Sequence, residues 1–186
     1  INIFLLCNIS KCKVVLYMKS KGGRNYLNVQ TEKAFEETIN KYKDMVYRLS
    51  YTYLKNSHDA EDITQEVFLK YITLNKTFES DEHLRYWLVT VTINRCKNLL
   101  RSSWFKKTQP LDETVHFEEA KNYNLYRAVM TLPKDYRTVI YLFYYEDYST
   151  KEIASILNKK DSTIRSQLAR ARKRLKNILL EDWKDE

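Results

Sequence analysis

Residues 149–176 read STKEIASILNKKDSTIRSQLARARKRLK and contain the clearest structural signal in the chain. Ser149 and Glu152 have the spacing of a capping box, in which a hydroxyl and a carboxylate each satisfy a free backbone N–H at a helix start. The short helix that follows carries the small residue Ala154, which lets a second helix approach closely. Asn158 suits the left-handed conformation of a sharp turn. The stretch therefore predicts a helix-turn-helix.

The second helix of this motif has one apolar and one polar face. Ile164, Leu168 and Leu175 recur at helical spacing and are expected to point back to the first helix. The outward residues of its N-terminal half are polar or basic, as in helices that meet base edges in the major groove. Arg165 suits bidentate bonding to guanine, whereas the trailing basic residues more often grip phosphate. The candidate DNA contacts are Ser162, Thr163, Arg165, Ser166, Gln167, Arg170 and Lys173.

A basic surface helix in an ordinary bundle is the plain alternative, since runs of charge are usually solvated faces. The run in residues 165–176 is almost entirely of one sign. It also coincides in register with the cap, the small residue, the turn and the apolar positions. We therefore interpret residues 149–176 as a DNA-binding element.

The composition of the whole chain favours helices and a polyanionic partner. Only 2 Gly and 2 Pro occur among 186 residues, and the formal net charge is +8. The three cysteines and three histidines lack the spacing of zinc ligands, so we expect no metal, no cofactor and a reducing, cytoplasmic setting. The longest early apolar run, residues 3–6, is too short to span a bilayer, and we expect no membrane insertion.

Three longer helices are predicted upstream of the motif. Apolar residues recur every three or four positions between Phe35 and Tyr53, which indicates an amphipathic helix. Ser80 is a good N-cap for the third of these helices. Their expected ranges are about 32–54, a second helix ending near 74, and about 81–101. Between His83 and Lys107 there is no acidic residue, so the third helix should present a positive surface that carries aromatic side chains.

The fold class expected is all-α, with two small helical domains joined by a flexible linker. Residues 106–121 have no clear period and are rich in acids, which is typical of a linker. The helical domains are then residues 30–105 and 122–182, the second containing the helix-turn-helix. Residues 1–29 have no helical period before Met18, a plausible initiator, and are expected to be a disordered or non-native extension.

With these features in order, the chain resembles the sigma-70 family of bacterial RNA polymerase initiation factors, in its extracytoplasmic-function (ECF) group. Residues 59–69, DAEDITQEVFL, are similar to the family's polymerase-docking helix. Trp87 and Leu88 followed by Asn94 and Arg101 resemble its minus-10-reading and melting helix. Residues 132–145 and 149–176 resemble its fourth region. The matches together cover nearly everything from Phe35 to Leu180.

The resemblance implies an initiation factor that binds core RNA polymerase and directs it to promoters, reading the minus-35 element through the helix-turn-helix. The docking residues would be Asp62, Gln65, Glu66 and Leu69. The loop before the third helix would receive a flipped base, next to a surface suited to unstacked bases and phosphates. The residues implied at the minus-10 element are Phe78, Glu79, Ser80, Tyr86, Arg95, Lys97 and Arg101. Trp87, at helical spacing with Leu84 and Leu88, is expected in the core.

The resemblance also implies an anti-sigma factor as a partner and a factor that is monomeric when free. The family commonly has an acid near Asn98, whose role here stays open. It also commonly has Gly near Asp147 and near Asn158. Asn and Asp tolerate the left-handed conformation, so both turns are expected to survive.

Two other classes of protein are alternatives to this interpretation. An enzyme is disfavoured, because the chain has no Gly-rich phosphate loop, no metal-spaced His and Cys set and no serine elbow. A stand-alone helix-turn-helix regulator, with an N-terminal bundle for dimerisation or sensing, is the alternative. It predicts specific binding to duplex operator DNA without polymerase.

Overall fold

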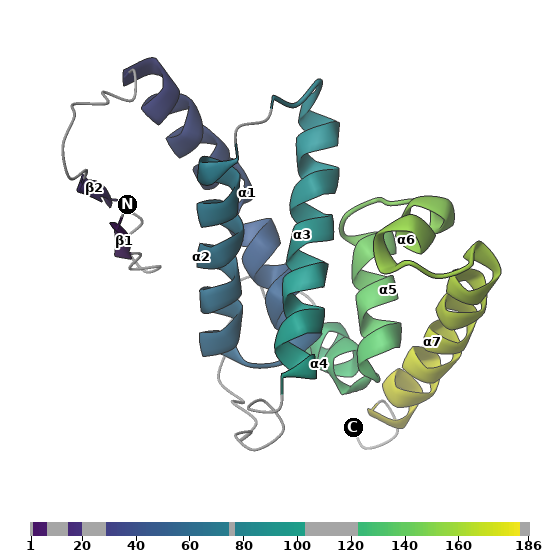
Figure 1. The fold of residues 1–186 in the computed structure, drawn as a ribbon. Coiled ribbons are helices and arrows are strands. Elements are labelled where there is room, and N and C mark those ends of the chain that lie inside the picture. Colours follow the sequence, from purple (N-terminus) through teal and green to yellow (C-terminus); the bar gives the residue numbers. More distant parts are fainter. Residues whose placement is uncertain (1, 7–14, 20–28, 75–76, 103–122, 183–186) are drawn as a thin grey trace.

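The computed structural model describes residues 2–6, 15–19, 29–74, 77–102 and 123–182. Within these ranges the chain forms seven helices and one pair of antiparallel strands. Figure 1 shows α1 to α3 gathered beside α4 to α7, with α5 and α6 next to α3. The elements in chain order are β1 (Asn2–Leu6), β2 (Val15–Lys19), α1 (Val29–Leu54), α2 (Ser57–Thr73), α3 (Asp81–Arg101), α4 (Tyr123–Thr131), α5 (Lys134–Tyr144), α6 (Thr150–Leu157) and α7 (Asp161–Asp182).

The all-α class is confirmed, and the helix bounds agree closely with the sequence pattern. The amide of Asp59 donates to Asn56 Oδ1 at 2.8 Å to cap α2, and the amide of His83 donates to Ser80 Oγ at 3.1 Å to cap α3. Pro133 stands at the N-cap of α5, where its missing N–H costs nothing. Local cap chemistry therefore sets these starts.

The strands β1 and β2 lie within residues 1–29, for which the sequence predicts a disordered or non-native extension. Asn2 pairs with Lys19 and Leu6 with Val15 in an antiparallel register. The two strands read NIFLL and VLYMK, short apolar runs that a search for helical periodicity does not detect. The expected linker, residues 106–121, lies outside the described residues.

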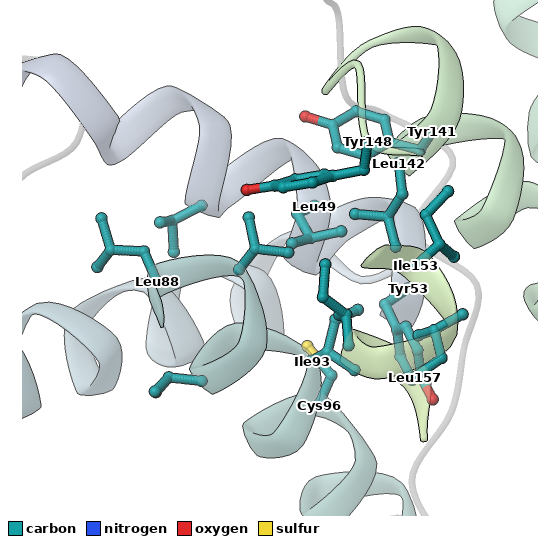
Figure 2. Packing of buried hydrophobic residues seen from close by; sticks show 14 of the residues in the cluster. Leu49, Tyr53, Leu88, Ile93, Cys96, Tyr141, Leu142, Tyr148, Ile153 and Leu157 are labelled. Carbon is teal, nitrogen blue, oxygen red and sulfur yellow. The ribbon is translucent and has the colours of Figure 1, made fainter. Parts of the chain in front are cut away.

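The core runs continuously through both sets of helices. We call α1–α3 the first helical group and α4–α7 the second helical group. Leu49 of α1 and Ile93 of α3 are fully buried, and so are Leu142 of α5 and Ile153 of α6. Figure 2 shows these side chains meeting at one place, with Tyr148 above them. The two groups therefore share one apolar interior instead of burying two separate ones.

Candidate DNA-binding site

The helix-turn-helix is built as the sequence predicts. The Ser149 amide donates to Glu152 Oε2 at 2.8 Å, and the Glu152 amide donates to Ser149 Oγ at 3.3 Å, which completes the capping box of α6. Asn158 ends that helix in the left-handed conformation with φ of 53°. Asp147 also has φ of 53°, so Asn and Asp do serve at turns where the family commonly has Gly.

Small and branched apolar residues hold α7 against the rest of the second helical group. Ile164 and Leu168 are buried on α7, together with Ala171, and Leu175 packs on the edge of the core. Ala154 of α6 is buried as well, as expected for a small residue at a helix crossing. One face of α7 is therefore fixed, and its opposite face is left in solvent.

The solvent face of α7 carries most of the predicted minus-35 contacts. Ser162, Thr163, Arg165, Ser166, Arg170 and Lys173 are all exposed. Arg165 forms an i,i+4 pair with Asp161, with Nη2 to Oδ2 at 3.3 Å. The side chain of Arg165 is two-thirds exposed, so it can exchange this contact for a base edge.

Gln167 differs from the other predicted contacts, because it is half-buried and faces α5. Its Nε2 lies 3.5 Å from Asp135 Oδ2, the oxygen that also accepts from Lys159 Nζ at 2.8 Å. Burial alone would raise the pKa of Asp135, but the hydrogen bond and charge of Lys159 outweigh it and lower that pKa. Asp135 thus ties the turn and α7 to α5, and Gln167 takes part in this contact.

Of the four predicted minus-10 residues on α3, three contact other helices and the fourth, Arg101, is exposed. The Tyr86 hydroxyl bonds Ser155 Oγ at 2.9 Å, and Lys97 Nζ donates to the Leu157 carbonyl at 3.2 Å, both on α6. Burial, and then the positive charge of Lys159, lowers the pKa of Lys97. Arg95 lies 3.5 Å from Glu66 of α2.

The three loop residues predicted at the minus-10 element are placed differently from one another. The Phe78 ring packs against Trp87, with ring centroids 5.4 Å apart, and also contacts Tyr71. Glu79 and Ser80 are exposed, and Ser80 is used as the cap of α3. Trp87 is half-buried and packs on the core, in accord with the expectation for it.

The predicted polymerase-docking residues lie on the outward side of α2. Ile63, Val67 and Phe68 turn into the core, which leaves the opposite side of the helix to solvent. Asp62 and Glu66 are exposed there, while Gln65 and Leu69 are partly exposed. These four residues therefore form one accessible surface.

Sequence reasoning missed a buried arginine between the two helical groups. Arg137 of α5 is only 6% exposed, and its guanidinium donates to the carbonyls of Thr52, Tyr53 (2.9 Å) and Leu132 (3.0 Å). Burial lowers its pKa to about 10. The position of Arg137 in the α5 pattern gave no signal of this role, because the acceptors are backbone atoms distant in sequence.

A second missed feature is an apolar groove between α4, α5 and α7. It has a volume of about 610 Å³ and basic residues at its edge. Tyr144, Tyr145 and Leu180 are large apolar side chains there that remain about half exposed. The lining residues are Leu125, Val129, Ile140, Tyr144, Tyr145, Arg172, Leu175, Lys176, Leu179 and Leu180.

Two negative findings concern the described part of the chain. It holds no group of three or more His, Cys, Asp or Glu side chains that could bind a metal ion. None of its helices has both the length and the apolar character needed to cross a membrane.

The fold and site define a helical DNA-binding protein with a helix-turn-helix and a second basic helix.

Comparison with known proteins identifies the family. Residues 38–106 match sigma-70 region 2 and residues 123–175 match sigma-70 region 4. The RNA polymerase sigma factor SigV of Bacillus subtilis is 34% identical over 152 residues, covering 77% of this chain and 90% of that protein. The ECF RNA polymerase sigma factor SigW of the same species is 28% identical, covering 78% and 89%.

Two solved structures share the fold. Sigma factor RpoE of Bartonella quintana, in complex with the anti-sigma factor NepR, has a TM-score of 0.66 at 22% identity and covers 79% of this chain and 97% of that one. CnrH, in complex with the cytosolic domain of CnrY, has a TM-score of 0.57 at 21% identity, covering 81% and 90%. At such identities the likeness concerns the fold alone.

The chain belongs to the sigma-70 family of RNA polymerase sigma factors, in its ECF group. It is a transcription initiation factor that directs RNA polymerase to specific promoters. A stand-alone helix-turn-helix regulator is not favoured, because the match to region 2 extends over α1 to α3, the part that such a regulator would use for dimerisation or sensing.

Proposed function

We propose that α7 reads the minus-35 element, that α3 with the loop before it contacts the minus-10 element, and that the outward side of α2 docks on core polymerase. The observation that carries this division is the exposed row of polar and basic side chains on α7, on a helix fixed by buried Ile164 and Leu168. Base edges and phosphates require such a row. The factor would work in the cytoplasm, where polymerase and promoters are found.

Run-off transcription tests the proposal. Core polymerase from the source organism is incubated with sheared genomic DNA, with and without this chain, and the transcript starts are sequenced. We expect new starts that share a minus-35 and a minus-10 element only when the chain is present. If the free protein protects duplex operators while no start depends on it, the proposal is wrong.

Charge reversal on α2 tests the docking surface. Asp62→Arg should weaken co-purification with core polymerase. The exposed acid is expected to meet a basic partner surface, and an arginine in its place would repel that surface. Asp44→Arg is the matched control, since Asp44 is also an exposed acid but lies on α1. Equal retention of the two variants would remove α2 from the interface.

We further propose an anti-sigma factor as a protein partner that contacts the apolar groove of the second helical group. Support comes from the half-exposed Tyr144, Tyr145 and Leu180 beside Arg172 and Lys176, a surface suited to an apolar helix with acidic flanks. The solved structures of RpoE and CnrH, which share this fold, contain the anti-sigma factor NepR and the cytosolic domain of CnrY, respectively. Co-expression with the adjacent gene product tests this, and Leu180→Arg should reduce the binding that the unaltered chain shows.

A further inference from the structure

A single acid stands at the start of the basic helix α7. Asp161 is the first residue of this helix, and no other acid follows it there until Glu181. The basic residues between them include Arg165 and Arg170. A carboxylate at this end repels DNA phosphates, so it weakens by electrostatics the very contact proposed for the helix. A further role for Asp161 would account for an acid at this position.

The geometry ties Asp161 to Arg165. Asp161 Oδ2 lies 3.3 Å from Arg165 Nη2, across one turn of the helix, where side chains four residues apart are neighbours. Asp161 Oδ1 is buried and has no hydrogen-bond partner among the described residues. With one oxygen shielded from solvent, the carboxylate has little freedom to turn, and Oδ2 is the oxygen that remains for the arginine.

Arg165 depends on this partner for its orientation. Its side chain is 66% exposed, and Asp161 is the only ion-pair partner that it has in the described part of the chain. An arginine in solvent samples many rotamers, and ordering it on binding costs conformational entropy. The pair holds the guanidinium toward the N-terminal end of α7, which is the end that meets base edges in helix-turn-helix complexes.

Arg170 has no comparable neighbour. It is exposed, and the residues three and four positions away on either side are Ser166, Gln167, Lys173 and Arg174, none of which is acidic. A phosphate can be met from many directions, so an arginine that contacts phosphate needs no fixed orientation. Guanine differs, because its O6 and N7 accept two parallel bonds from a planar fork in one orientation. The acid thus accompanies the arginine whose orientation matters.

We propose that Asp161 is a positioning residue that sets the base specificity of Arg165, at some cost in affinity for DNA. The inference rests on the proposed function, because it deepens the minus-35 contact assigned to α7. A held fork loses less entropy when it binds guanine, whereas a freely moving arginine also reaches phosphates and other bases. Removing the acid should therefore lower discrimination between bases and raise affinity for DNA of any sequence.

The test uses holoenzyme reconstituted from core polymerase and this chain. Duplex promoters found by run-off transcription are varied at each base pair of the minus-35 element, and the ratio of bound fractions reports discrimination. Asp161→Ala should lower the preference at the position that Arg165→Ala also affects, by about three- to tenfold. It should raise binding to a duplex with a scrambled element by about twofold. Asp161→Glu keeps a carboxylate within reach of Arg165 and should retain the preference.

Asp147→Asn is the matched control. Asp147 is an exposed acid of the same helical group, and Asn also tolerates its left-handed backbone. Adding Asp161→Ala to Arg165→Ala should cause no further loss at that base pair, which assigns the effect to the pair of residues. Urea unfolding checks that Asp161→Ala is folded, and Asp161→Asn, which keeps the shape of the aspartate, carries the test if it is not.

Two results would overturn the inference alone. One is a base preference in Asp161→Ala equal to that of Asp147→Asn. The other is a loss spread evenly over the minus-35 positions together with weaker binding to the scrambled element, which is what a purely structural role predicts. A wild-type holoenzyme without any minus-35 preference would contradict the proposed function and this inference with it, so the two failures are distinguishable.

Discussion

The two basic helices of this chain, α3 and α7, differ sharply in what they show to solvent. On α7 the predicted contacts Arg165 and Arg170 are exposed. On α3, Tyr86 and Lys97 are hydrogen-bonded to α6, and Arg95 lies against Glu66. Arg165 of α7 pairs with Asp161 of its own helix, whereas these three α3 side chains contact other helices.

The difference shows that the chemistry of a surface and its availability have separate origins. Basic and aromatic residues make the surface of α3 suited to phosphates and unstacked bases, while its packing against α6 engages Tyr86 and Lys97 in contacts within the protein. On α7 the face that carries Ile164 and Leu168 is buried within its own helical group, and the opposite face remains in solvent.

The largest expected effect is a loss of stability, from a substitution in the core that α3 shares with the second helical group. Ile93→Ala removes a fully buried side chain, and should lower the free energy of unfolding by about 2–5 kcal/mol. Hydrogen exchange followed by mass spectrometry should also show lower amide protection in α6, although α6 is unaltered. Leu180→Ala, at a half-exposed site of α7, should change stability by less than about 0.5 kcal/mol. Unchanged α6 protection in Ile93→Ala would mean that the two groups are independent.

The next effect is on the exposed helix. Arg165→Ala should weaken initiation at a promoter that depends on the minus-35 element. The expected loss in promoter-binding free energy is about 1–3 kcal/mol, the cost of losing a bidentate guanine contact. Arg165→Lys keeps the charge but not the planar fork, so it should recover only part of the loss. Promoter titration with reconstituted holoenzyme measures both variants. Full activity of Arg165→Lys would assign Arg165 to phosphate contact instead.

A smaller effect is expected at the cap that starts the helix-turn-helix. Ser149→Ala removes the acceptor of the Glu152 amide and should cost about 1 kcal/mol in urea unfolding. Lys151→Ala, an exposed position in the same first turn, is the control. A loss no larger than that of the control would show that the second helical group does not depend on this cap.

Local features of the site could be predicted from sequence, and contacts between distant residues could not. The Ser149 and Glu152 box and the left-handed Asn158 involve neighbours within a few positions, so their chemistry is readable in the sequence itself. Arg137 bonds the carbonyl of Thr52, 85 positions away, and backbone acceptors leave no mark on residue type.

The contacts between α3 and α6 could not be predicted from sequence for a related reason. Tyr86 and Lys97 suit contact with DNA and equally suit contact with α6, whose Ser155 lies 69 positions from Tyr86. Residue type alone cannot choose between these two partners. The choice depends on how the two helical groups pack, and helical periodicity within either group does not determine that packing.

The smallest expected effect concerns Asp135, which holds α7 to its own helical group. Its folded-state pKa lies below the usual value, so the ionised carboxylate stabilises the native state at neutral pH. This contribution should be lost as the pH falls below about 4 through the depressed pKa. Urea unfolding of Asp135→Asn should show a modest loss at neutral pH, and the gap to wild type should close in acid. Asp44→Asn, an exposed change on α1, is the control. A gap that persists in acid would mean that shape, and not charge, fixes α7 to α5.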